Sequence, residues 1–322
     1  MNNFRTEVSI QKSNVELNHN RPILSFGSCF AFEIFKKLRN YGFQAQHPGG
    51  VIYNPISILD IMHKGLNNIP YVITDLVRYR NTYFSWFHSG KDYHEVSSEK
   101  LIRQLNDENL VVKEFLKNKP IILITFGTAY IYELQSSSQI VANCHKQNSA
   151  LFSKRKLTVE EITTPWKNLI KHVDAEFIFT VSPVRHLKDG LVENNVSKST
   201  LILAVEEIIS AFPNKSTYFP SYEILLDELR DYRFYASDWI HPSKEAVDYI
   251  WEKFYRSFMA DSSQALILEI EKIRKGLNHK ILYEIDTEFY KKLLKKIELV
   301  KSKTPHYAWE HEIAFIQQYL AD

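Results

Sequence analysis

Apolar and polar residues follow one another in a repeating strand-then-helix pattern over the first 260 residues. The run 120–126 is apolar without alternation, which is typical of a parallel strand covered on both faces. After the apolar run 23–26, hydrophobic residues recur every three or four positions up to Tyr41, and Gly42 follows where a helix is expected to end. The same reading predicts strands near 43–46, 175–181 and 217–219, and helices from Asn54 and near 96–117, 194–211, 221–231 and 243–257.

This alternation of strands and helices predicts an α/β fold in which a parallel sheet lies between two layers of helices, a three-layer α/β/α sandwich. From about residue 260 the pattern changes: the segments 262–276, 286–301 and 307–320 read as helices, with no further strand. We therefore expect a main domain over 1–259 and an α-helical C-terminal extension over 260–322. An extension docked over a functional site would be a lid, and one docked elsewhere would stabilise the fold or mediate dimerisation.

Composition narrows the class of protein. A hydrophobic content of 44% in 322 residues is that of a globular chain. Forty basic and 38 acidic residues nearly cancel, so strong nonspecific binding to nucleic acid or to an anionic membrane is not indicated. The N-terminus lacks an apolar leader, and the two cysteines, Cys29 and Cys144, do not make a disulfide framework. We expect a cytoplasmic protein with neither a nucleic-acid nor a membrane partner; its oligomeric state stays open.

Polar and small residues follow each predicted strand of the sheet. Ligands of open parallel sheets bind beyond the carboxyl ends of the strands, so these loops are expected to meet at one edge. In chain order they supply Ser28 and Cys29, Gly49 and Gly50, Gly127 and Thr128, Ser182 and His186, and finally Asp238 and His241.

Three of these residues fit nucleophilic catalysis. Ser28 lies where a helix begins, so a nucleophile there gains backbone N–H donors and a favourable dipole. His241 is a candidate general base, and Asp238, three residues earlier, is placed to orient its ring. A glycine-serine pair or an Asp-x-x-His segment alone is more often structural. Their joint position in the first and last loops is what favours a catalytic role.

Several motifs also carry a resemblance to a known family. Residues 27–31 read Gly-Ser-Cys-Phe-Ala, and similar family motifs follow at 50–55, 141–146, 182–186, 218–223, 229–235 and 238–242. The stretch from about 4 to 258 thus resembles the GSCFA family, a branch of the SGNH/GDSL hydrolase superfamily.

The resemblance implies a flavodoxin-like parallel sheet and a serine esterase-type site with Ser28, Asp238 and His241 as catalytic residues. It also implies an oxyanion site formed by the Ser28 N–H, the Gly50 (or Gly49) N–H and an asparagine side chain. The expected reaction is hydrolysis of a small-molecule or carbohydrate ester, of which deacetylation of a carbohydrate is one form, without a cofactor. The alternatives are an acyltransferase using the same triad and a catalytically degenerate binding or scaffold protein.

The sequence departs from the superfamily pattern at the nucleophile. The superfamily reads Gly-Asp-Ser at its first block, so an alignment without gaps puts Cys29, not Ser28, in the nucleophile position. We favour Ser28 and keep Cys29 as the alternative, since a thiol at the start of a helix can be activated. The structural interpretation is that Cys29 is a small residue that packs the helix against the sheet.

The second departure concerns the amide donor. Residues 127–130 read Gly-Thr-Ala-Tyr, where the superfamily has an asparagine. A hairpin over 130–134 and 138–142 would bring Asn143 to the same edge as a substitute; alternatively, Asn143 closes an Asx turn. Cys144 and His145 would then lie near the site, and Ser182 and His186 would line it.

Three further ligand chemistries concern a metal, a sugar ring and an anionic substrate. Cys29, Cys144, His145 and His241 match no standard zinc spacing, so no metal site is expected. Aromatic residues surround the Asp-x-x-His segment and would either stack a sugar ring or pack the core: Tyr232, Phe234, Tyr235 and Trp239. Arg230 and Arg233 would either bind an anionic substrate or pair with Asp227 and Asp231.

Overall fold

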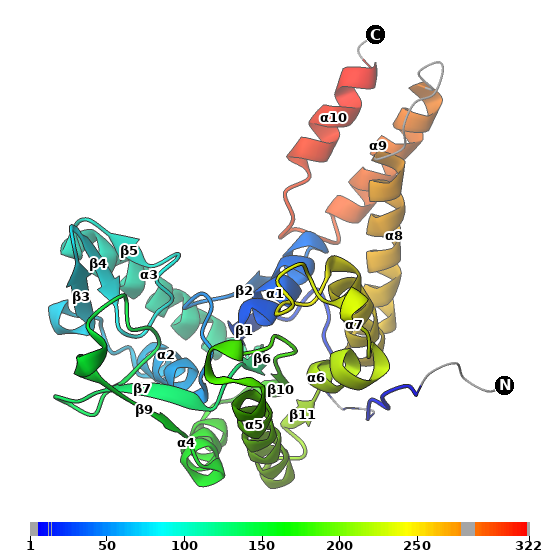
Figure 1. The fold of residues 1–322 in the computed structure, drawn as a ribbon. Coiled ribbons are helices and arrows are strands. Elements are labelled where there is room, and N and C mark those ends of the chain that lie inside the picture. Colours follow the sequence, from blue (N-terminus) through cyan, green and yellow to red (C-terminus); the bar gives the residue numbers. More distant parts are fainter. Residues whose placement is uncertain (1–5, 12, 14, 278–286, 321–322) are drawn as a thin grey trace.

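A five-stranded parallel sheet forms the centre of the computed structural model, which describes residues 6–11, 13, 15–277 and 287–320 (Figure 1). The strand order is β11-β10-β6-β1-β2, which places the first strand inside the sheet. Ile23 pairs with Ile121, and Phe177 pairs with Ile122, in parallel register. The strands are β1 (Ile23–Gly27), β2 (Ala45–Gln46), β6 (Ile121–Phe126), β10 (Glu176–Val181) and β11 (Ser216–Tyr218).

Helices cover both faces of this sheet, as the unalternated apolar strands predict. Ile121 and Leu123 point into one hydrophobic cluster with α1 (Cys29–Asn40) and α7 (Lys244–Phe258). Ile122 and Ile124 point into a second cluster on the opposite face. Four helices contribute to that second cluster: α2 (Pro55–Asn67), α3 (Ser98–Lys117), α4 (Val159–His172) and α5 (Leu191–Ala211). The three-layer α/β/α prediction is confirmed.

Two small antiparallel sheets extend the domain beyond the central one. The first comprises β3 (Leu76–Tyr79), β4 (Thr82–Ser85) and β5 (His94–Glu95), which the hydrophobic pattern did not predict. The second comprises β7 (Tyr130–Leu134), β8 (Ile140–Val141) and β9 (Phe152–Lys156). The predicted hairpin over 130–142 is thus confirmed, and β9 joins it as an additional strand.

The helix predicted near 221–231 is shorter and less regular than expected. It comprises α6 (Ser221–Glu223) and a π-helical turn (Ile224–Glu228), which leaves Glu228 buried. That carboxylate accepts hydrogen bonds from the Val8 N–H at 3.0 Å and binds the Lys253 ammonium at 2.9 Å. Short 3-10 turns lie at Ile73–Asp75, Ser149–Leu151, Leu187–Asp189 and Tyr232–Phe234.

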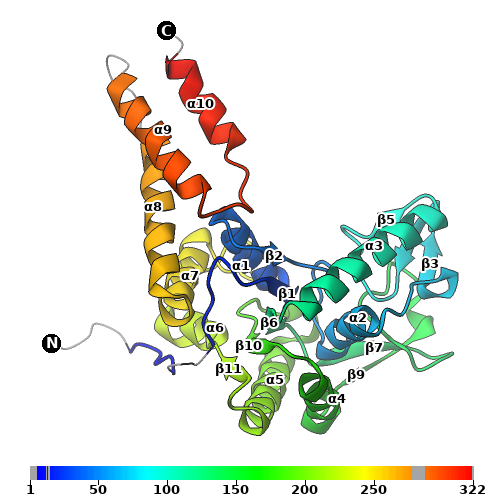
Figure 2. The same ribbon diagram turned by 180° about the vertical axis from the view of Figure 1, so that it is seen from behind.

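Within the described residues, three helices follow α7, beginning where the sequence pattern changes: α8 (Asp261–Leu277), α9 (Thr287–Lys301) and α10 (Glu310–Leu320). They project away from the sheet and lie beside the C-terminal end of α1 (Figures 1 and 2). There the Tyr41 hydroxyl donates to Glu271 at 3.0 Å, and Thr304 lies against Gly42. Since α1 runs about 18 Å from its first residue to this end, the extension lies far from Ser28. That position does not fit a lid, and it fits an element that stabilises the fold or mediates dimerisation.

Within the described ranges, none of the helices has both the length and the apolar character that crossing a membrane requires.

Candidate active site

The junction between β1 and α1 is a tight turn that only glycine permits. Gly27 has φ +133°, and a Cβ at this position would lie 2.9 Å from the Thr125 carbonyl carbon on the neighbouring strand. The Gly27 carbonyl in turn accepts the Ile52 N–H at 2.8 Å, which fixes the segment after β2 beside the junction. The backbone therefore passes directly from the centre of the sheet into the first turn of α1.

Ser28 lies at this junction with its side chain inside the protein. The residue is 1% exposed, and its hydroxyl donates to the Ser182 hydroxyl at 2.8 Å. Its backbone N–H donates to the Thr125 carbonyl at 3.3 Å. An oxyanion bound by this N–H would have to displace Thr125.

Cys29, the first residue of α1, is more accessible. Its side chain is partly exposed, and its sulfur lies 3.5 Å from the Tyr53 hydroxyl. Ser28 occupies the N-cap position, but its side chain makes no capping hydrogen bond to the helix. Since the first N–H groups of a helix have no acceptor within it, this turn offers donors to a negative charge.

Asp238 and His241 form the predicted pair. Their side chains meet at 2.6 Å between Oδ2 and Nδ1. The other carboxylate oxygen accepts the N–H groups of Ile240 at 2.9 Å and His241 at 3.0 Å. The hydrogen bond from His241, followed by these N–H groups, lowers the pKa of Asp238 to about 2. Asp238 thus stays ionised and orients the imidazole, whose Nε2 has no hydrogen-bond partner among the described residues, as a general base requires.

The loop after β10 connects the two halves of the site. Its Ser182 accepts the Ser28 hydroxyl, and its Arg185 N–H donates to the Ile240 carbonyl at 3.1 Å. The Arg185 guanidinium also lies 3.9 Å above the Tyr235 ring. Among the described residues, no hydrogen bond joins His241 to Ser28 or to Cys29. The structure therefore brings Asp238 to His241, while the contact between His241 and the nucleophile stays a prediction.

The two glycines after β2 differ in what they can bind. The Gly49 N–H is already occupied, because it donates to the Tyr93 hydroxyl at 3.0 Å and to Glu108 at 3.1 Å. The Gly50 N–H donates to no described residue, and Gly50 adopts φ +66°. Of the two, Gly50 is the candidate oxyanion donor.

The loop after β6 is held by backbone contacts. The N–H groups of Gly127 and Thr128 both donate to the Tyr53 carbonyl, at 2.7 and 2.9 Å. The Thr128 hydroxyl is paired with that of Ser197 at 3.1 Å. Both residues lie at the predicted edge of the sheet, where they shape the site without offering a free N–H.

Asn143 closes a turn, which is the structural alternative that the sequence left open. Its side-chain oxygen accepts the His145 N–H at 2.8 Å. His145 is buried, with Nε2 2.7 Å from the Ser85 carbonyl and its ring stacked on Phe84. Burial raises the pKa of the Cys144 thiol. These contacts give Asn143 and His145 structural roles, and an oxyanion role of Asn143 stays a prediction.

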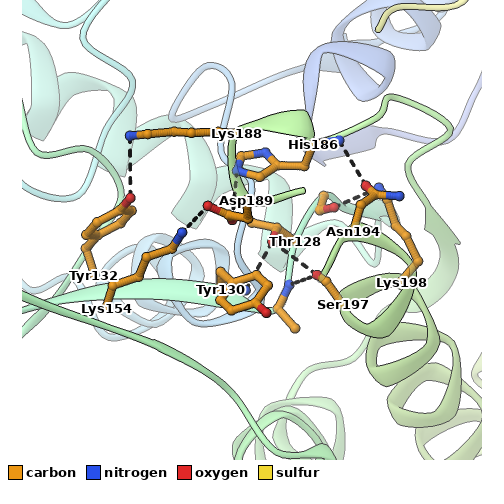
Figure 3. A network of polar contacts seen from close by, with 12 residues as sticks. Thr128, Tyr130, Tyr132, Lys154, His186, Lys188, Asp189, Asn194, Ser197 and Lys198 are labelled. Atoms are coloured by element: carbon orange, nitrogen blue, oxygen red, sulfur yellow. Dashed lines mark hydrogen bonds and ion pairs between the residues drawn. The ribbon is translucent and has the colours of Figure 1, made fainter. Parts of the chain in front are cut away.

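His186 belongs to a polar network beside the loops after β6 and β10 (Figure 3). Its Nε2 lies 3.6 Å from Asp189, which also pairs with Lys154, and its backbone N–H donates to Asn194 at 2.9 Å. Burial lowers the pKa of His186, and the Asp189 carboxylate opposes this shift. Its ring centroid lies 6.3 Å from that of Tyr53, so His186 is a neighbour of the residue that contacts Cys29.

Lys198 on α5 is a residue that the sequence reading missed. It is 1% exposed, and its ammonium donates to the Gly127 and Ser182 carbonyls, each at 2.7 Å. No described carboxylate lies within ion-pair distance, and burial lowers the pKa of Lys198 to about 7. The sequence did contain a signal for its burial, because Lys198 lies on the same side of α5 as the apolar residues Leu201 and Val205.

The arginine and aromatic residues near the Asp238–His241 pair fall into three groups: ion-paired, packed against the core, and exposed. Arg230 binds Asp227 at 3.0 Å and Arg233 binds Asp231 at 3.2 Å, so both form the local ion pairs that were the alternative to substrate binding. Phe234 and Tyr235 pack against the core. Tyr232 and Trp239 are exposed and in contact, with ring centroids 5.8 Å apart. They form an aromatic surface next to Asp238 and His241.

Comparison with known proteins identifies the family. A model of the GSCFA family matches residues 22–254. The chain belongs to the GSCFA family. The match begins just before β1 and ends within α7, so it includes every loop of the candidate site and leaves α8, α9 and α10 outside. A search of curated proteins finds no match to this GSCFA chain. In the part of the chain that the structure describes, no three His, Cys, Asp or Glu side chains converge as a metal site would need.

Proposed function

We propose that this GSCFA protein is a carboxylic ester hydrolase of the SGNH/GDSL type, which forms an acyl-enzyme at the β1–α1 junction. The observation that carries the proposal is the Asp238–His241 pair, with its 2.6 Å hydrogen bond and an ionised carboxylate held by two N–H groups. An imidazole oriented in this way is the base that hydroxyl or thiol nucleophiles need.

In the proposed reaction, the Ser28 hydroxyl turns from Ser182 to His241 and attacks the acyl carbon of the ester. Nε2 of His241 takes the hydroxyl proton and then gives it to the departing alcohol. Water, activated by the same imidazole, releases the acid and restores Ser28. The Gly50 N–H and the first N–H groups of α1 stabilise the negative charge on the carbonyl oxygen in both steps.

Cys29 is the alternative nucleophile, and the observation that supports it is its partial exposure, since Ser28 is buried. The reaction would then pass through a thioester with the same base. An acyltransferase differs only in the acceptor that replaces water. The exposed Tyr232 and Trp239 support a carbohydrate ester as substrate, because sugar rings stack on such surfaces.

The test is covalent labelling with a fluorophosphonate and, separately, with iodoacetamide, followed by peptide mapping. We expect fluorophosphonate at Ser28, with labelling lost in Ser28→Ala and His241→Ala and retained in His172→Ala, which removes an exposed histidine of α4. Rapid alkylation of Cys29 that depends on His241 would instead move the nucleophile by one residue. If a folded protein reacts with neither reagent at this junction, the enzyme proposal is wrong and a binding or scaffold role takes its place.

A further inference from the structure

A side-chain donor is missing from the oxyanion site as described so far. After Gly127 and Thr128 the chain continues with Ala129, which is fully buried and has no donor group, and with Tyr130, whose ring lies 5.0 Å from the Lys154 ammonium. The side-chain oxygen of Asn143 accepts the His145 N–H, which holds this exposed amide in a turn of its own. The proposed chemistry nevertheless develops a full negative charge on the carbonyl oxygen, and each missing donor costs about 100- to 1000-fold in rate.

Tyr53 lies against the loop after β6, where the side-chain donor is missing, and its side chain extends to the β1–α1 junction. Its backbone carbonyl accepts the N–H groups of Gly127 and Thr128, at 2.7 and 2.9 Å, so Tyr53 is fixed against the loop after β6. A Cβ on Gly127 would lie 3.1 Å from the Tyr53 Cα, which shows how closely the two segments approach. From this anchored backbone the phenol extends to Cys29, with 3.5 Å between hydroxyl and sulfur.

We infer that the Tyr53 hydroxyl is the side-chain oxyanion donor of this site and therefore a catalytic residue, an inference that rests on the proposed ester hydrolysis. The carbonyl oxygen of an ester attacked at the β1–α1 junction lies within a bond or two of the nucleophile. A hydroxyl already in contact with Cys29 is positioned to donate to that oxygen, whether Ser28 or Cys29 attacks.

The protonation of Tyr53 suits a donor. Burial, reinforced by the neighbouring Cys29, raises the pKa of Tyr53 above that of a free phenol. The hydroxyl consequently stays protonated at neutral pH and does not serve as the base. It stabilises the oxyanion by a hydrogen bond alone, so no proton is transferred, and the bond weakens again when the tetrahedral intermediate collapses.

The Tyr53→Phe variant tests this role, because it removes the hydroxyl and keeps the ring. The matched control is Tyr79→Phe, a tyrosine of β3 on one of the small sheets. Two rates are compared by mass spectrometry of the peptide that contains Ser28 and Cys29. Acylation by p-nitrophenyl acetate passes through an oxyanion, whereas alkylation of Cys29 by iodoacetamide does not.

We expect Tyr53→Phe to slow acylation about 100- to 1000-fold while alkylation stays near the wild-type rate, with both rates unchanged in Tyr79→Phe. Acylation at the wild-type rate in Tyr53→Phe would overturn the inference and leave the proposed hydrolase intact. An equal fall in both rates would overturn it too, since the hydroxyl would then act on the thiol or on the fold. Wild-type protein that is alkylated but never acylated would refute the hydrolase itself, and the inference with it.

Discussion

Replacing Lys198 by methionine is expected to change how the stability of the protein depends on pH. Lys198 is almost completely buried, and its ammonium meets two backbone carbonyls but no described carboxylate. Burial without a counter-ion disfavours the charged form and lowers the pKa of Lys198 from 10.5 to about 7. The unfolded chain holds this proton up to about pH 10.4.

The sign follows from proton binding in the two states. Between pH 7 and 10 the unfolded chain binds the Lys198 proton and the folded chain has largely released it, so a rise in pH favours the folded state. The slope approaches about 1.4 kcal/mol per pH unit above pH 8. From pH 7 to pH 9 the wild type should therefore gain about 2 kcal/mol of unfolding free energy relative to Lys198→Met.

The assay is urea unfolding at pH 6, 7, 8 and 9 under reducing conditions, followed by tryptophan fluorescence. Lys171→Met, which removes an exposed lysine from the last turn of α4, is the control and should follow the wild type at every pH. Parallel curves for wild type and Lys198→Met would show that the ammonium is not desolvated in the folded protein, and the burial argument would fail.

Two further predictions concern stability around the ends of α1. Gly27→Ala should destabilise the protein by more than about 3 kcal/mol, because its φ is +133° and the new Cβ would overlap the Thr125 carbonyl; a melting temperature within a few degrees of wild type would contradict this. Ile267→Ala on α8 should cost about 2–5 kcal/mol through a buried cavity. Its labelling at Ser28 or Cys29 should nevertheless match the wild type, and a large loss of labelling in folded protein would show that the extension controls the site.

Much of the fold can be predicted from the sequence, because strands buried on both faces carry uninterrupted apolar runs. The strand 121–126 has no polar residue before Thr125 and is buried on both sides, so its apolar run is sufficient evidence. The strand Phe152–Lys156 reads Phe-Ser-Lys-Arg-Lys and has three exposed positions. It exists because it pairs with Tyr130–Leu134, a partner that local pattern does not indicate.

In the candidate site, too, a contact within one loop can be predicted from the sequence, whereas contacts between distant segments cannot. Asp238 and His241 are three residues apart in one loop, so their spacing alone predicts the contact that forms. The Ser28–Ser182 hydrogen bond joins residues 154 positions apart, and Tyr53 reaches Cys29 only because Ile52 pairs with Gly27. Contacts of that kind depend on the assembled sheet, which explains why Tyr53 and Lys198 were missed.

The interior position of β1 has a consequence for the order in which the turn at Ser28 assembles during folding. β1 lies between β6 and β2, so its pairing with β6 must wait until β6, nearly a hundred residues further along the chain, has been synthesised and the intervening loop has closed. Closing loops of this length is slow compared with helix formation. The Ser28 hydroxyl, in turn, meets Ser182 only after β10 has joined the sheet. A nascent chain therefore carries Ser28 from its first few dozen residues, but the contact between Ser28 and Ser182 forms only after most of the central sheet has assembled.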